Sequence, residues 1–548
     1  MGSVNNKLAA LMGAILFLSI PLQNVNAQDK HMHEEHPISG DATIGEVNFN
    51  VDCREEVRDD FNRAVAMLHN MMYATARENF KEITDADPNC AMAYWGIATT
   101  LFQPLWGTRP SGEDLTYGWQ TINKAKERVD SKREELLIES TAGFFREPES
   151  ADFRTRLDRW IEGVGAAYKS YPNDHDIAAL YGLTKLVKAQ FVEDRSQLLN
   201  EAQAILRDIY EQEPRHPGAI HYTIHATDVD GRADNALNIV EAYGEIAPDV
   251  PHALHMPTHI YVRLGDWPKV IDWNWRSANA ALNHPVNGAV SHHYLHAVDY
   301  LVYAYLQQGK DGKAEKVYRE AMNKDRYQAS FISAFHVAAT PARLVVEQKD
   351  WERAKALETR KPEYLPWDAS PWAEGLTWYA KGLGAVHLGD IKSAGQAEQK
   401  LKELRNTAKK SGADGMATYI ETDRLVLEGW IAYKNGNNER AVNLMRSAAG
   451  LEDKTEKHPV TPGALQPPYE ALGDLLMKLD RPSEALAAYE DSNANWPGRL
   501  NTLLGAALAA RLLGKDKLAR KHIENLVNRS GEPEMESVTA VRGSVNKK

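Results

Sequence analysis

Eleven of the nineteen histidines lie close together in the middle of the chain. They are His216, His221, His225, His252, His255, His259, His284, His292, His293, His296 and His336. Three pairs are four residues apart, namely His221 and His225, His255 and His259, and His292 and His296. On a helix, two residues with this spacing lie on the same face. Neutral imidazoles on one face are common ligands of zinc and copper, so the spacing indicates a metal site.

Six of these histidines are the predicted metal ligands. They are His221, His225, His252, His255, His259 and His296. Met256 lies beside them in the sequence and would favour copper, whereas imidazoles alone also suit zinc. Asp228, Asp230 or Asp299 could accept a hydrogen bond from a ring N–H group or act as a base. A catalytic metal site would leave one coordination position open.

A second interpretation of the histidines needs no metal. A histidine in a helical groove can simply form a hydrogen bond with a carbonyl or carboxylate group. The sequence has no His-Glu-x-x-His, no set of cysteine ligands and no Gly-x-Ser-x-Gly, so no familiar hydrolase motif supports catalysis. Pro257 would also interrupt the helix that carries His255 and His259, unless it lies in the first turn. The sequence leaves open whether the protein is an enzyme.

Rigid elements must hold these rings in place, and the sequence predicts that these elements are helices. From Val57 onward, amphipathic segments of roughly twelve to sixteen residues alternate with short turns that contain Gly, Pro or Asp. Strand-like alternation is almost absent, so we predict an all-α fold. At 548 residues the chain is too long for one compact core, which favours several domains or a repeat array.

The breaks between the helices recur at a constant spacing. In residues 466–499, the positions of Gly473, Ala485 and Tyr489 resemble the tetratricopeptide signature, whose period is 34 residues. Further units in the same phase lie near 217–250, 251–284, 295–328, 422–455 and 500–533. The resemblance covers most of residues 57–527. It implies a superhelix of stacked helix pairs, an α-solenoid, with a concave groove.

In tetratricopeptide repeats, positions 2, 5, 9, 12 and 13 of each first helix line this groove. The resemblance places at these positions the predicted histidine ligands and six further residues. The six are Asp228, Arg263, Asp299, Tyr303, His336 and Arg343. In the flanking units, the histidine enrichment is absent, because the corresponding positions hold Asp176, Ala179, Leu183, Leu376, Tyr379 and Asp423. We therefore predict that the six residues bind a ligand in the groove.

Residues 1–27 have the composition of a cleavable signal peptide. Lys7 supplies a positive charge, an apolar run follows, and residues 25–27 resemble a small-residue cleavage site. We therefore predict a periplasmic or secreted protein. An uncleaved anchor is the alternative, although the run is shorter than the ~20 apolar residues that a membrane-spanning helix needs. After removal of the signal we expect no segment that spans a membrane.

The segments on either side of the predicted repeats are polar and lack a helical period. We predict a flexible lead-in over residues 28–56 and a disordered tail over residues 528–548. His31, His33 and His36 in the lead-in could capture a metal loosely, because no rigid surroundings would fix its geometry.

The chain has only two cysteines, Cys53 and Cys90. In an exported protein they could form a disulfide that joins the lead-in to the first helices. Two buried thiols are the alternative, because the sequence fixes neither the distance nor the orientation of the side chains.

Longer runs resemble one group of bacterial exported tetratricopeptide proteins. These runs are residues 221–226, 246–248, 252–260, 299–309 and 467–473. The resemblance supports the fold and export, and it implies no settled biochemical role.

Three functions fit these observations. The first is a binding or scaffold protein that holds a protein, peptide or small ligand in its groove. The second is a metalloprotein or metal-dependent enzyme that uses zinc or copper at the histidines, and the third is a periplasmic metal carrier. A formal net charge of -12 gives no electrostatic reason to bind nucleic acid, and we expect none as a partner.

Overall fold

The computed structural model describes residues 42–105, 109–192, 194–229 and 231–530. Within these ranges the protein is all-α, without β-strands, and its β pairing is limited to isolated bridges such as that between Val286 and Ala289. The first helices are η1 (Glu55–Val57), α1 (Arg58–His69), α2 (Tyr73–Ala86), α3 (Ala91–Thr99), α4 (Gly112–Lys126), α5 (Lys132–Phe145), α6 (Phe153–Ser170), α7 (His175–Ala189) and α8 (Ser196–Gln212).

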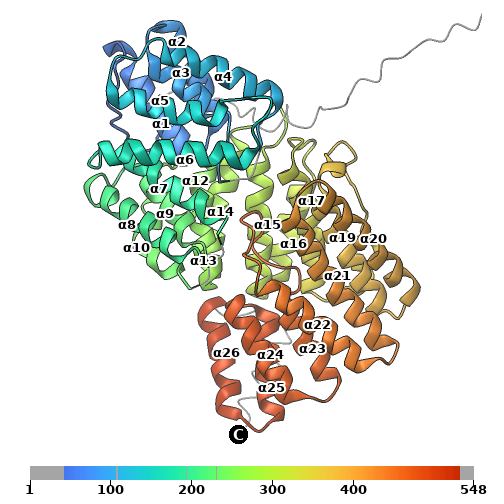
Figure 1. Ribbon diagram of the computed structural model, residues 1–548. Coiled ribbons are helices and arrows are strands. Elements are labelled where there is room, and N and C mark those ends of the chain that lie inside the picture. The colour runs from blue at the N-terminus through green and yellow to red at the C-terminus, as the bar shows by residue number, and fades with distance from the viewer. Residues whose placement is uncertain (1–41, 106–108, 193, 230, 531–548) are drawn as a thin grey trace, which may run out of the picture.

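The central and final helices complete the chain (Figure 1). The central ones are α9 (Pro217–Thr227), η2 (Ala233–Ala236), α10 (Leu237–Val240), α11 (Tyr243–Ile246), α12 (Pro251–His255), α13 (Pro257–Leu264), α14 (Trp267–Leu282), α15 (His292–Gln307), α16 (Asp311–Met322), α17 (Phe331–Glu347), α18 (Trp351–Ala356) and η3 (Trp367–Ala369). The final ones are α19 (Pro371–His387), α20 (Ile391–Lys410), α21 (Asp414–Lys434), α22 (Asn438–Glu452), α23 (Pro468–Lys478), α24 (Pro482–Asn495), α25 (Leu500–Leu512) and α26 (Asp516–Ser530).

Consecutive helices pack in antiparallel pairs, as in tetratricopeptide repeats, and the packing of Tyr489 shows why the signature residues recur. A Cβ atom added at Gly473 would lie 2.6 Å from the Tyr489 ring, and one added at Gly505 would lie 2.4 Å from it. The ring on α24 therefore fits against α23 and α25 only because both glycines lack a side chain. Ala485 and Ala519 are fully buried, where a larger residue would push the helices apart.

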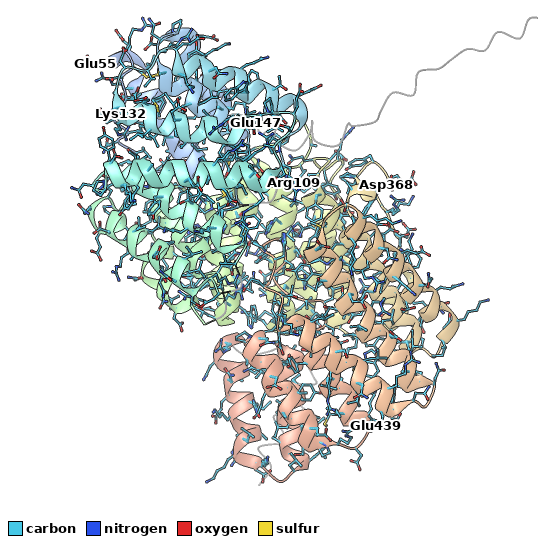
Figure 2. All side chains as sticks on the ribbon, in the orientation of Figure 1. Glu55, Arg109, Lys132, Glu147, Asp368 and Glu439 are labelled. Carbon is cyan, nitrogen blue, oxygen red and sulfur yellow. A yellow bond between two sulfur atoms is a disulfide. The ribbon has the colours of Figure 1, made fainter. Side chains whose placement is uncertain are left out.

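Two of the predicted repeat units are irregular. In unit 217–250 the second helix is broken into η2, α10 and α11. In unit 251–284 the first helix is divided at Met256, and Pro257 occupies the first turn of α13. Proline is tolerated there because the first N–H groups of a helix have no intrahelical acceptor. Charged side chains such as Asp368 and Glu439 project from the outer surface (Figure 2).

The described part of the predicted lead-in is packed, and the prediction of flexibility is wrong for residues 42–56. Ile44 and Phe49 are buried, and the Phe49 ring contacts Phe61 and Trp95. A disulfide joins Cys53 to Cys90. The segment is polar in its overall composition, so its composition did not indicate that these apolar residues pack against α1 and α3. The predicted signal peptide, His31, His33, His36 and residues 531–548 lie outside the described ranges; residues 528–530 belong to α26.

The superhelix closes on itself, because the last helices pack against the central ones. Figure 1 shows α24, α25 and α26 below α13 and α14. The Trp267 indole donates a hydrogen bond of 3.0 Å to the carbonyl of Gly498. The backbone N–H of Leu500 donates to the Gln307 side chain at 2.9 Å. None of the helices in the described ranges is long and apolar enough to cross a bilayer.

Residues 453–467, between α22 and α23, cover the concave side of the central helices. Tyr300 donates to the carbonyl of Pro459 at 3.0 Å, and Arg343 donates to that of Gly463 at 3.1 Å. Lys457 is buried, with its Nζ atom 3.6 Å from a carboxylate oxygen of Asp228. The concave groove that we predicted to hold a ligand is therefore filled by the chain itself at these positions. The repeat signature describes neighbouring helices and carries no information on such a distant segment.

Candidate metal centre

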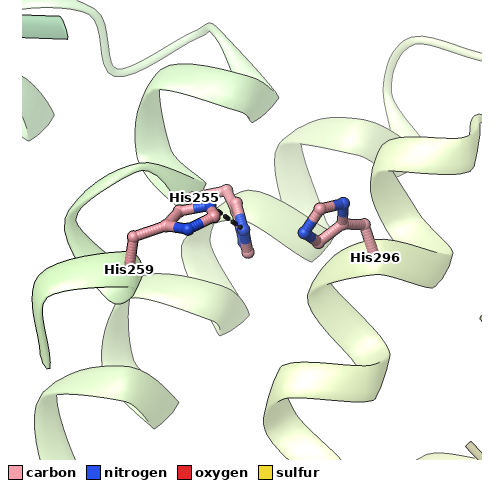
Figure 3. Close-up of side chains that lie close together, drawn as sticks. All are labelled: His255, His259 and His296. Carbon is pink, nitrogen blue, oxygen red and sulfur yellow. Dashed lines mark hydrogen bonds between the residues drawn. The ribbon is translucent and has the colours of Figure 1, made fainter. Parts of the chain in front are cut away.

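Three predicted ligands converge between α12, α13 and α15. His255 and His259 face each other, with 3.1 Å between their Nε2 atoms. His296 approaches from α15, and one ligand atom from each of the three rings lies within 4.8 Å of the others. Figure 3 shows the three rings pointing toward one another. The interruption at Met256 therefore does not separate the two rings that are four residues apart.

The second nitrogen of His255 is held by Asn274 on α14. Asn274 Nδ2 donates to the carbonyl of Val270 at 2.7 Å, which fixes the orientation of the amide. Its Oδ1 atom therefore faces His255 Nδ1, at 2.8 Å, and the nitrogen must donate. In the neutral ring, Nε2 then carries the lone pair. We did not predict this role, although Asn274 stands where the repeat signature has an aromatic residue.

The second nitrogen of His259 is held by Asp228. His259 Nδ1 donates to Asp228 Oδ2 at 3.0 Å, and Arg263 Nε donates to Oδ1 at 2.9 Å. Burial alone would raise the pKa of Asp228, but Lys457 and Arg263 outweigh it and hold that pKa well below its usual value. The carboxylate is therefore ionised and can only accept. His259 Nε2, like that of His255, carries a lone pair.

Two lone pairs that face each other at 3.1 Å repel unless a cation lies between them. A proton is not the favoured cation near neutral pH, because burial lowers the pKa of both His255 and His259. A zinc ion bound at ~2.0–2.1 Å in tetrahedral geometry would hold two nitrogens roughly 3.3 Å apart, close to the observed separation. A carboxylate or amide oxygen that orients each ligand is also typical of metal sites.

His296 and His336 extend the group toward α17. The His296 and His255 ring centroids are 4.1 Å apart, and those of His296 and His336 are 4.7 Å apart. His336 Nδ1 donates to Asp299 at 3.2 Å, and Arg343 Nε donates to the other carboxylate oxygen at 2.9 Å. The Nε2 atoms of His296 and His336 are buried, and no hydrogen-bond partner for them lies in the described chain. His336 therefore adjoins the centre through His296, outside the three-histidine set whose ligand atoms lie within 4.8 Å of one another.

The residues predicted to bind a ligand in the groove have internal partners instead. Asp228 and Arg263 orient His259, and Asp299 and Arg343 orient His336. The Tyr303 hydroxyl accepts a hydrogen bond of 3.1 Å from Arg499. Except for Arg263, which is partly buried, these residues are almost completely inaccessible. Asp230 lies outside the described ranges.

His221, His225 and His252 lie next to this centre and form a separate group. The ring of His221 is 5.0 Å from that of His225 and 5.1 Å from that of His252. The structure therefore divides the six predicted ligands into two sets of three. His252 and His255 share the short helix α12, so that helix connects the sets.

Another group, His69, Asp176 and His216, is less suited to a metal. His216 caps α9, and its Nδ1 atom accepts a hydrogen bond of 3.2 Å from the N–H of Ala219. The neutral ring therefore carries its proton on Nε2, which lies 3.7 Å from Asp176. The remaining candidate group contains Cys53 and Cys90, whose sulfurs are joined in the disulfide.

No protein-family model matches the chain, and no curated protein matches it. Among solved structures, "Crystal structure of APC/C hetero-tetramer Cut9-Hcn1" is similar over 89% of this chain and 90% of that chain, with 14% identity and a TM-score of 0.30. A structure of a monomeric mutant of IFIT1 with Gppp-AAAA is similar over 87% of this chain and 96% of that chain, with 11% identity and a TM-score of 0.34. At these values, neither similarity carries a conclusion about function.

A small cavity of about 70 Å³ is lined by Lys457 and His458 and by residues of α19 and α21. Asp423 and Glu452 line it together with aromatic residues such as Trp372 and Tyr419. Glu452 Oε1 accepts a hydrogen bond of 3.0 Å from the Trp496 indole, whereas Oε2 is buried without a partner in the described chain. Burial raises the pKa of Glu452 to about 8.

Glu452 should therefore make the protein less stable as the pH rises. Between its unfolded pKa and about 8, the folded state holds a proton that the unfolded state has lost, so the free energy of unfolding decreases with pH. At pH ~8, Glu452→Gln is expected to be more stable than the wild type by at least about 1 kcal/mol, with little difference near pH 5. Urea unfolding of both proteins at the two pH values measures this, and an equal difference at both would contradict it.

Proposed function

We propose that the protein binds a divalent transition metal, zinc or copper, at His255, His259 and His296. The helical-repeat fold is typical of binding and scaffold proteins. A peptide in the groove is the weaker interpretation here, because residues 453–467 cover the positions that would bind it. Export is part of the proposal, and it is supported by the disulfide between Cys53 and Cys90, since disulfides persist in oxidising compartments.

One observation carries the proposal. The Nε2 atoms of His255 and His259 are 3.1 Å apart, and the acceptors on the opposite side of each ring leave both with lone pairs. A histidine that served only as a hydrogen-bonding core residue would have a donor opposite that lone pair. The third ring, that of His296, supplies the remaining ligand of a three-histidine set, and a fourth position is left for water or a substrate.

The test is the metal content of the purified full chain. The double variant His255→Ala/His259→Ala is expected to lose the ion at this site, with affinity reduced at least about 100-fold. The matched control, His175→Ala/His387→Ala, removes two imidazoles outside the cluster and should retain the ion. Circular dichroism checks that both variants fold.

Two outcomes would overturn the proposal. Metal-free wild-type protein that stays metal-free after incubation with zinc or copper would support a scaffold role. Metal that disappears only when residues 28–37 are deleted would favour a carrier that binds through His31, His33 and His36. The deletion therefore belongs in the same experiment.

A further inference from the structure

The two sets of three histidines occupy equivalent positions in successive repeats. In each set, two rings four residues apart come from the first helix of one unit, and the third ring comes from the first helix of the next unit. The sets are His221, His225 and His252, and His255, His259 and His296. Stacking of the repeats therefore places two sets of three histidines side by side.

The ring spacing of the first set resembles that of the second, although only the second of the two sets brings one ligand atom from each ring within 4.8 Å of the others. The rings four residues apart are separated by 5.0 Å for His221 and His225, against 4.9 Å for His255 and His259. The third ring, that of His252, lies 5.1 Å from that of His221, against 4.1 Å for the corresponding pair. The first set is thus slightly more open.

The orientation of His221 suits a metal ligand. Its Nδ1 atom lies 2.8 Å from the backbone carbonyl of His69, which can only accept, so Nδ1 carries the proton. Nε2 then carries a lone pair, and it is completely buried with no hydrogen-bond partner in the described chain. His225 Nε2 is likewise buried and without a partner there. A carbonyl that orients the far nitrogen is a common feature of histidine metal ligands.

Two polar groups near this set have hydrogen-bond partners elsewhere. The nearby hydroxyl of Tyr243 donates to Asn70 at 2.7 Å and is not directed at His221. Asp228, which follows α9, accepts hydrogen bonds from His259 and Arg263. The lone pairs of closely spaced neutral imidazoles repel one another, and a soft or borderline divalent ion between them removes this repulsion.

We propose that His221, His225 and His252 bind a second zinc or copper ion, which forms a two-ion centre with the one at His255, His259 and His296. The inference rests on the proposed function. Helix α12 carries one ligand of the first set, His252, and one of the second, His255, and therefore fixes the two sites relative to each other.

The experiment measures how many zinc ions the full chain binds. Metal-free protein is dialysed against zinc chloride, and bound zinc is quantified for the wild type and for three variants. We expect two ions for the wild type, one for His221→Gln/His225→Gln, one for His255→Gln/His259→Gln, and none for the quadruple variant. Glutamine keeps much of the side-chain volume, which limits unfolding. The double variant His175→Gln/His387→Gln is the control and should bind two ions.

The outcomes separate this inference from the proposed function. A wild type with one ion, retained by His221→Gln/His225→Gln and lost by His255→Gln/His259→Gln, overturns the second ion and leaves the first. Absence of zinc from every protein overturns both. If a variant does not fold, titration of the wild type with Co²⁺ tests the inference instead. The second equivalent of Co²⁺ should increase the visible absorption by about as much as the first. Saturation after one equivalent would overturn the inference.

Discussion

Lowering the pH from about 7.5 to about 5.5 is expected to cost the metal-free protein several kcal/mol of its free energy of unfolding. The reason is the number of neutral buried histidines whose pKa burial lowers. They are His69, His221, His225, His252, His255, His259, His296 and His336. Below the ordinary histidine pKa, the unfolded chain binds protons that the folded chain does not. Stability therefore rises with pH in this window and is lost as the pH falls.

Each of these histidines can contribute up to about 1.4 kcal/mol per pH unit in that window. Urea unfolding at several pH values, with EDTA present, gives the slope and hence the protons taken up on unfolding. The variant His221→Gln/His225→Gln should take up about two fewer protons. A free energy of unfolding that stays constant between pH 7.5 and 5.5 would contradict the burial of these rings in the neutral state.

Arg499→Met is expected to lower the free energy of unfolding by about 3–5 kcal/mol. Arg499 is completely buried between Glu347, 2.8 Å away, and Glu470, 3.0 Å away, and it also donates to Tyr303. These partners lie on α17, α23 and α15, so the guanidinium joins the C-terminal helices to the central ones. Its removal leaves two carboxylates buried without their cation, a far greater cost than the loss of a surface ion pair.

Arg481→Met is the matched control, because Arg481 forms ion pairs with Glu439 and Glu484 near the surface. Its loss should cost at most about 1 kcal/mol. The triple variant Arg499→Met/Glu347→Leu/Glu470→Leu should recover much of the lost stability, since it removes the stranded charges together with their partner. Urea unfolding of all three measures the effect. Equal losses for Arg499→Met and Arg481→Met would show that the buried network does not hold the closed superhelix together.

The sequence predicted that His255, His259 and His296 would lie together, but it did not predict the contacts that orient them. The spacing of His255 and His259 indicates a shared helix face, and the two rings do meet, despite Pro257. The sequence did not identify Asn274 as the partner of His255. Its unusual place in the repeat signature was the only sign, because a hydrogen bond between helices depends on their packing angle and not on spacing along the chain.

By itself, the amino-acid sequence determined the helices, their pairing and the clustering of histidines in successive units, since these depend on periodicity and on small residues such as Gly473 that admit the Tyr489 ring. Only the tertiary structure decided that residues 453–467 fill the groove, that Lys457 reaches Asp228, and that six histidines divide into two sets of three. Those contacts join residues far apart in the chain. Their formation depends on how the whole superhelix closes, and no local sequence pattern predicts that closure.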